Sequence, residues 1–156
     1  ILKELEEINT ILKSSAVDKA LEYLRIAMDE SLKLKGVEGF DHYTAKVKLV
    51  NELLKEGGSC YLEAEQTKLS KIGYRPDAVI IRDDEIVIVE IETDRSRAVK
   101  KLKKLKRCLD KIKTHPIVGN RRLRIVFGIL DELDEKGKEL AKQLGVEVYD
   151  AKSLRR

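Results

Sequence analysis

The sequence predicts a small mixed α/β domain with a helical extension in front of it. Two short runs rich in Val and Ile, 78–81 and 86–89, flank the polar segment 82–85 and have the pattern of a β-hairpin. A long amphipathic stretch, 95–113, separates this hairpin from a further apolar run at 125–130. Strand, helix and strand in this order form a crossover unit with a parallel strand pair. The 156 residues suffice for one such domain with its own hydrophobic core.

The first 38 residues predict the helical extension, and residues 39–156 predict the α/β domain. Residues 1–13 carry apolar side chains at helical spacing, and a second stripe predicts another helix from Ser15 to about Lys35. We favour packing of these stripes within the protein, and a dimer contact is the alternative.

One helix and one strand are expected between the extension and the hairpin. The helix starts at Asp41 as its N-cap and ends before Gly57 and Gly58. Its buried stripe is expected to comprise Tyr43, Val47, Val50 and Leu54. Residues 59–69 predict the first strand, whose side chains alternate between two faces. One of these faces is expected to carry Tyr61, Glu63 and Glu65.

Three acidic side chains fall at the open end of the predicted hairpin. With the turn centred between residues 83 and 84, Val79 pairs with Ile88 and Asp77 faces Glu90. Alternation places Glu92 on the same face. Carboxylates that repel each other at the end of a buried sheet persist most easily around a cation. These hard oxygen ligands predict a site for Mg²⁺ or Mn²⁺.

Each of these acids also has a structural explanation. In that alternative Asp77 is a turn residue after Pro76, and Glu90 and Glu92 lie where their strand reaches solvent. For three acids in register we favour the metal site. A slip of the register by one residue would break the pairing.

The segment 95–113 predicts a helix that begins at Thr93-Asp94 and stops before Pro116. Its buried stripe is expected to comprise Ala98, Leu102, Leu105, Leu109 and Ile112. The segment carries ten lysines or arginines against one acid, Asp110, which gives a net charge of +9. A surface for the phosphate backbone of DNA is one interpretation, and a solvated helix face is the other. Because the segment offers only one acidic partner, we favour nucleic acid. The expected backbone contacts are Arg95, Arg97, Lys100, Lys101, Lys104, Arg121 and Arg122.

The C-terminal part continues the α/β pattern. After the strand at 125–130, a last helix is expected from Asp131 or Asp134 to Gly145, followed by a short strand at 146–149.

The composition indicates the setting of the protein. Charged residues make up 38% of the chain, rich in Lys, Glu and Arg, and this balance fits a thermophile. Two cysteines far apart in the sequence, Cys60 and Cys108, form no metal-ligand spacing and indicate a reducing, cytoplasmic compartment. No apolar run approaches the length of a membrane span, so we expect a soluble protein without a membrane partner.

Pro76-Asp77, followed after a gap by Glu90-Ile91-Glu92, resembles the motif of the PD-(D/E)xK nuclease superfamily, which includes restriction endonucleases and archaeal Holliday junction resolvases. The resemblance covers roughly residues 41–150. It implies a restriction endonuclease-like core of a helix, a three-stranded meander, a helix and a strand. Glu92 stands where the motif usually has a lysine.

The resemblance implies a metal-dependent DNA nuclease. Asp77 and Glu90 would hold Mg²⁺ or Mn²⁺, and Glu92 would ligate the metal through water or orient the attacking water. The metal would lower the pKa of that water and stabilise charge on the attacked phosphate. Homodimers are common among such enzymes.

The resembled fold often draws a further acid from the helix before the first strand. Asp41 and Glu52 are the candidates there, and Glu63 is a candidate from the first strand. A helix cap, a solvated helix charge and an exposed strand edge are their respective structural alternatives. Lys68 is a candidate for the lysine missing at position 92.

Two other functions stay open. Because Glu92 replaces the motif lysine, the first alternative is a nuclease-like module that binds DNA or has a structural role without cleaving it. The second is a protein-interaction domain built on the N-terminal helices.

Overall fold

The computed structural model describes residues 3–4, 6, 21–27, 40–62 and 64–150, and it divides the chain into two compact units, 1–43 and 44–156. In the first unit residues 21–27 are helical, and Arg25 forms an ion pair with Glu6 at 2.6 Å. Most of the predicted N-terminal helices lie outside the described residues. The boundary expected between residues 38 and 39 stays a prediction.

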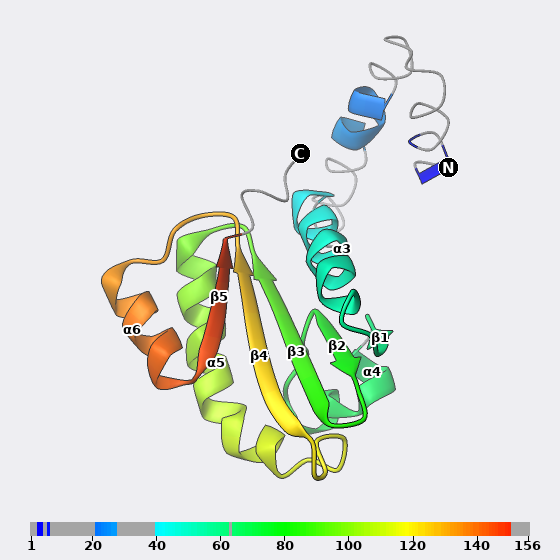
Figure 1. Ribbon diagram of the computed structural model, residues 1–156. Helices are drawn as coiled ribbons and strands as arrows, with labels where there is room; N and C mark the ends of the chain where they lie inside the picture. Colours follow the sequence, from blue (N-terminus) through cyan, green and yellow to red (C-terminus); the bar gives the residue numbers. More distant parts are fainter. Residues whose placement is uncertain (1–2, 5, 7–20, 28–39, 63, 151–156) are drawn as a thin grey trace. The chain divides into compact units, whose positions relative to one another are not determined.

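The second unit is built on a five-stranded sheet in which the strands lie side by side in chain order (Figure 1). The strands are β1 (Ser59–Tyr61), β2 (Ala78–Ile81), β3 (Glu85–Glu92), β4 (Arg122–Ile129) and β5 (Val146–Asp150). The first three form an antiparallel meander, and β3, β4 and β5 are parallel. In the β2–β3 hairpin Val79 lies opposite Ile88, so the predicted register is confirmed.

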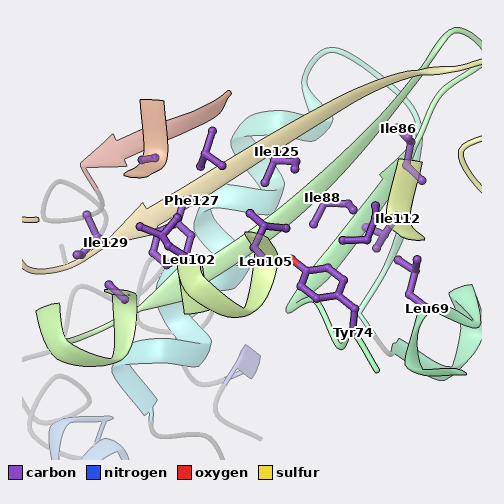
Figure 2. Close-up of a cluster of buried hydrophobic side chains, with 14 of the residues drawn as sticks. Leu69, Tyr74, Ile86, Ile88, Leu102, Leu105, Ile112, Ile125, Phe127 and Ile129 are labelled. Atoms are coloured by element: carbon purple, nitrogen blue, oxygen red, sulfur yellow. The ribbon is translucent and has the colours of Figure 1, made fainter. Parts of the chain in front are cut away.

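Helices cover both faces of this sheet (Figure 1). On one face α5 (Arg95–Lys113) and α6 (Glu135–Gln143) pack on side chains such as Ile88 and Phe127. Figure 2 shows this cluster, with Leu102 and Leu105 of α5 among the strand side chains. On the other face α3 (Phe40–Leu54) packs on a second cluster. The central strand β3 is buried along its whole length, as expected for a strand covered on both faces.

The predicted helix after the hairpin is confirmed. Asp94 caps α5 by accepting a hydrogen bond from the backbone N–H of Arg97 at 3.0 Å. Of the predicted stripe, Ala98, Leu102, Leu105 and Ile112 are buried, and Leu109 packs against them. The last helix starts after Asp134, which caps it, and Gly145 follows its end with a positive φ of 67°.

The prediction of a strand over 59–69 is wrong beyond Tyr61. The chain forms a short helix, α4 (Ala64–Thr67), and then a 3-10 helix, η1 (Leu69–Ile72). Ala, Glu and Gln favour helix over strand, and η1 buries Leu69 completely in the core under α5. An alternation of side chains therefore did not suffice to identify a strand here.

The predicted buried stripe of α3 is also wrong in part. Ala45, Leu49 and Leu53 face the sheet, whereas Tyr43 is 49% exposed. Two apolar stripes overlap on this helix, and the one with the two large leucines at a spacing of four packs on β2 and β3. Within the described ranges, no helix is long and apolar enough to cross a membrane.

Candidate active site

Asp77, Glu90 and Glu92 meet on the face of the sheet that α5 covers. The backbone N–H of Asp77 donates to Val89 O at 3.1 Å, which extends the β2–β3 pairing beyond the strand. The Asp77 carboxylate in turn accepts a hydrogen bond from the backbone N–H of Ile91 at 2.8 Å. These two bonds fix the aspartate next to the end of β3, where both glutamates lie.

Lys101 of α5 lies between the three carboxylates. Its Nζ is 2.7 Å from Asp77 Oδ2, 3.0 Å from Glu90 Oε2 and 3.3 Å from Glu92 Oε1. It also donates to the backbone oxygen of Ile91 at 3.0 Å. Four oxygen atoms thus surround one ammonium group, so a cation does sit among the acids, and it belongs to the chain itself.

The geometry of the crossover explains how Lys101 reaches this point. Because β3 and β4 are parallel, α5 runs back across the sheet after it starts at Asp94, shortly behind Glu92. Lys101 borders the buried stripe, next to Leu102. Helical side chains lean towards the N-terminus of their helix, so the lysine points back to the end of the strand where the acids lie.

Glu90 is the most buried of the acids, with 4% of its side chain exposed. Its Oε1 accepts a hydrogen bond from the hydroxyl of Tyr74 at 2.7 Å, and Tyr74 lies in the core cluster of Figure 2. Burial raises the pKa of Glu90 to about 7, the Lys101 ammonium opposes this rise, and the charge of Asp77 adds to it. Burial and the charge of Glu90 raise the pKa of Tyr74 well above its usual value, so the phenol remains a hydrogen-bond donor.

The ionisation of Lys101 is settled by the same contacts. Burial alone lowers the pKa of a lysine, but the charges of Glu90 and Asp77 and the hydrogen bond to Asp77 outweigh it and raise the pKa of Lys101 above its usual value. The lysine is therefore an ammonium ion at neutral pH.

The donor atoms of this site suit a divalent metal. They are carboxylate oxygens and a backbone carbonyl, the hard ligands that Mg²⁺ and Mn²⁺ prefer. Glu90 Oε2 is buried, and it forms an ion pair with the Lys101 ammonium at 3.0 Å without regular hydrogen-bond geometry. Among the residues that the structure describes, no group of three His, Cys, Asp or Glu side chains has the arrangement of a metal site. The Lys101 ammonium lies between the three acids instead.

The other predicted acids stand apart from this site or outside the description. Glu52 is exposed on α3 and forms an ion pair with Lys55 at 2.6 Å. Glu63 and the side chain of Asp41 lie outside the described residues. Lys68, the candidate for the displaced lysine, is exposed at the start of η1 with a φ of 60°. The lysine that meets the acids is Lys101, which the sequence had placed only among the DNA contacts.

The predicted DNA contacts on α5 fall into two groups. Lys100 and Lys104 line a shallow, open depression of about 380 Å³ on the surface of α5, together with Lys101, Lys103 and Arg107, and this depression is called the cavity of α5 below. Arg95 and Arg97 instead lie at the start of the helix. Arg95 donates to the backbone oxygen of Glu132 at 2.8 Å, and Arg97 lies 3.8 Å from Asp94. The cavity next to Lys101 is thus the basic surface that directly adjoins the acids.

Arg121 and Arg122 lie at the opposite end of the sheet. Arg122 is in register with Glu85, at the start of β3, and Glu90 and Glu92 lie roughly 17 and 23 Å further along the strand at about 3.3 Å per residue. Arg122 pairs with the buried Glu85, and Arg121 donates to the backbone oxygen of Arg82 at 2.8 Å. Both arginines thus have structural partners, and their contact with DNA stays a prediction.

One comparison with known proteins identifies a family resemblance for this part of the chain. Residues 77–147 match the family model of the PD-(D/E)XK nuclease superfamily, and this segment contains the acids, Lys101 and α5. The predicted resemblance is therefore confirmed over this segment, and the mixed α/β sheet is a nuclease-like core. The match indicates a nuclease-like function, and nucleases of this superfamily generally use divalent metals.

The comparisons with solved structures and with curated protein sequences add no support to the family match. Among solved structures, protein VC1899 from Vibrio cholerae aligns at 17% identity over 53% of this chain and 20% of that chain, with a TM-score of 0.36. That likeness is too weak to carry an argument. No curated protein sequence matches this chain.

Two site residues were not recognised in the sequence as parts of the acidic cluster. For Lys101 a partial signal exists, because Lys101 and Lys106 border the predicted stripe of α5 and only such edge lysines can reach under the helix. The contact of Tyr74 with Glu90 had no signal, because the two residues belong to different elements and their pairing depends on the path of the chain through η1.

Proposed function

We propose that this protein is a metal-dependent nuclease that hydrolyses phosphodiester bonds in DNA. The observation that carries this proposal is the meeting of three carboxylates and a lysine at the end of β3, beside the basic cavity of α5. An acidic metal site next to a cluster of cations is what phosphoryl chemistry on DNA requires.

Asp77 and Glu90 are the metal ligands in this proposal. Their oxygens are held by bonds to the surrounding structure, Asp77 by Ile91 and Glu90 by Tyr74. A bound divalent metal supplies a water of lowered pKa and stabilises charge on the phosphate under attack. Glu92 accepts a hydrogen bond from that water and so orients it towards phosphorus.

Lys101 provides the positive charge that the motif lacks at position 92. The helix brings its ammonium to the acids, where a strand lysine would otherwise project. This supports an enzyme over the alternative of a nuclease-like module without activity, since that alternative was motivated by the loss of the lysine.

The cations of the cavity position the DNA backbone. Lys100, Lys103, Lys104 and Arg107 are exposed and lie on the same helix as Lys101. Phosphate contacts of this kind fix the position of the duplex without selecting a sequence. Aromatic side chains are absent from the segment 95–113, so stacking on bases is not expected there.

A cleavage assay tests the proposal. The full chain is incubated with supercoiled, linear, single-stranded and branched DNA in the presence of Mg²⁺ or Mn²⁺. Asp77→Asn and Glu90→Gln should abolish cutting and leave most of the DNA binding, because they remove metal ligands and no basic residue. The matched control Asp110→Asn also removes one acid, from the exposed face of α5, and should cut normally. Cutting by both site variants would refute the proposal, and DNA binding without cutting by the unaltered protein would favour the inactive module.

A further inference from the structure

The ammonium of Lys101 occupies the point at which a metal would have to bind. The same atoms that would serve as ligands, Asp77 Oδ2 and Glu90 Oε2, lie 2.7 and 3.0 Å from Nζ. Mg²⁺ needs its oxygen ligands at about 2.0–2.1 Å, so it would sit at nearly the same centre as the nitrogen. Two positive charges at one point repel strongly in a buried site. The lysine and the metal therefore exclude each other.

The surroundings of Lys101 offer its side chain a second position. Its side chain is 27% exposed, more than any of the three acids that it contacts. The residue also lines the basic cavity of α5, so it borders both the acids and the surface proposed for phosphate. The flexible four-carbon stem of a lysine can move the ammonium from the acids to the cavity of α5. The buried side chains of Leu102 and Leu105 meanwhile keep the helix in place.

We propose that Lys101 is an exchangeable internal counter-ion, which neutralises the acids until a divalent metal displaces it into the cavity of α5. In the metal-loaded state its ammonium adds to the cations of that cavity and contacts the phosphate of the substrate. Metal binding and phosphate binding then support each other, because the metal delivers the lysine to the phosphate and the phosphate holds the lysine away from the acids. This inference rests on the proposed function, in that it assumes the metal site of Asp77 and Glu90.

Removal of the competing charge should strengthen metal binding. In the full chain without DNA, Lys101→Met should bind Mn²⁺ about tenfold more tightly or better than the unaltered protein, measured by isothermal titration calorimetry. The metal-free variant should also melt at a lower temperature, because its acids lose their counter-ion, and Mn²⁺ should raise its melting temperature more than that of the unaltered protein. Lys104→Met is the matched control, since it removes a lysine of the same cavity that lies outside the acidic cluster.

The outcomes separate the inference from the proposed function. Tighter binding by Lys101→Met, with unchanged affinity in Lys104→Met, supports the exchange. Equal or weaker binding by a folded Lys101→Met variant overturns the exchange and leaves the metal site intact. If neither the unaltered protein nor the variant binds Mn²⁺ or Mg²⁺, the metal site fails, and the exchange fails with it.

A second measurement uses the unaltered protein and does not depend on the folding of a variant. Reductive methylation of lysines, quantified by mass spectrometry of the peptide that contains Lys101, reports how accessible its nitrogen is. Saturating Mg²⁺ should raise the rate of modification at Lys101 several-fold, because the ammonium leaves the carboxylates, while the rate at Lys136 on α6 should stay constant. A rate at Lys101 that stays constant or falls, under conditions where calorimetry shows the metal bound, overturns the exchange.

Discussion

Replacement of Tyr74 by phenylalanine tests how Glu90 is held in the site. The substitution keeps the ring in the core and removes only the hydroxyl, which donates to Glu90 Oε1 at 2.7 Å. A hydrogen bond to a charged group contributes about 1.5–3 kcal/mol, and one between neutral groups contributes about 1 kcal/mol. Because burial raises the pKa of Glu90 to about 7, the carboxyl is mostly neutral at low pH and charged at high pH. The free energy of unfolding should thus fall by about 1 kcal/mol well below pH 7 and by about 1.5–3 kcal/mol above it.

Urea unfolding at pH 5.5 and pH 8.5 measures both values, and the difference between them is the diagnostic result. The direction of this pH dependence follows from the titration of Glu90. The bond from Tyr74 lowers the pKa of the glutamate, so its loss favours the protonated form and penalises the folded state most where the unaltered protein is ionised. Tyr61→Phe, at a half-buried tyrosine of β1, is the control and should show no such pH dependence. An equal penalty for Tyr74→Phe at both pH values would refute the reasoning.

Three further predictions concern stability and DNA binding. Glu85 is buried, but hydrogen bonds from two arginines outweigh the effect of burial and lower the pKa of its carboxyl group. The ionised Glu85 therefore stabilises the fold above the usual pKa of a glutamate, and this stabilisation is lost as the pH falls through the lowered pKa. Glu85→Gln should therefore cost about 1–3 kcal/mol of unfolding free energy at pH 7 and progressively less below about pH 4.5, which acid titrations of both proteins would show. Leu102→Ala, at a fully buried position, should lower the unfolding free energy by about 2–5 kcal/mol without a change in the urea m-value. Alanine at both Lys100 and Lys104 should reduce the slope of log K for DNA against log salt by about 0.9 for each phosphate that the variant no longer neutralises, and Lys136→Ala should leave the slope unchanged.

Much of the fold follows from local patterns of the sequence. The β2–β3 hairpin is specified by its two β-branched runs and the polar turn between them, and a slip by one residue would break the pairing of Val79 with Ile88. The helix α5 is specified by its cap at Asp94 and by a stripe that is almost wholly buried. The position of the polar turn sets the register of the hairpin, and the single apolar stripe sets the buried face of α5, and for that reason their prediction succeeds.

The segment 59–72 and the face of α3 could not be determined in this way. Each is compatible with two local patterns, and the choice is made by packing with distant parts of the chain. Leu69 enters the core below α5, and Leu49 packs on β2 and β3. Neither contact leaves a trace in the neighbouring sequence. A pattern of side chains predicts an element reliably only when it is compatible with a single local structure.

The acidic site shows the same division between local and distant information. Asp77 and Glu90 follow from the register of one hairpin, so a strand pattern places them together. The position of Lys101 depends on how α5 is rotated and how far it runs back over β3, which no short motif encodes. A lysine on the strand would be fixed at the acids by the strand itself. Lys101 on the helix is held there by its ion pairs with the acids and by its hydrogen bond to the backbone oxygen of Ile91, and the proposed exchange requires a divalent metal to replace these contacts.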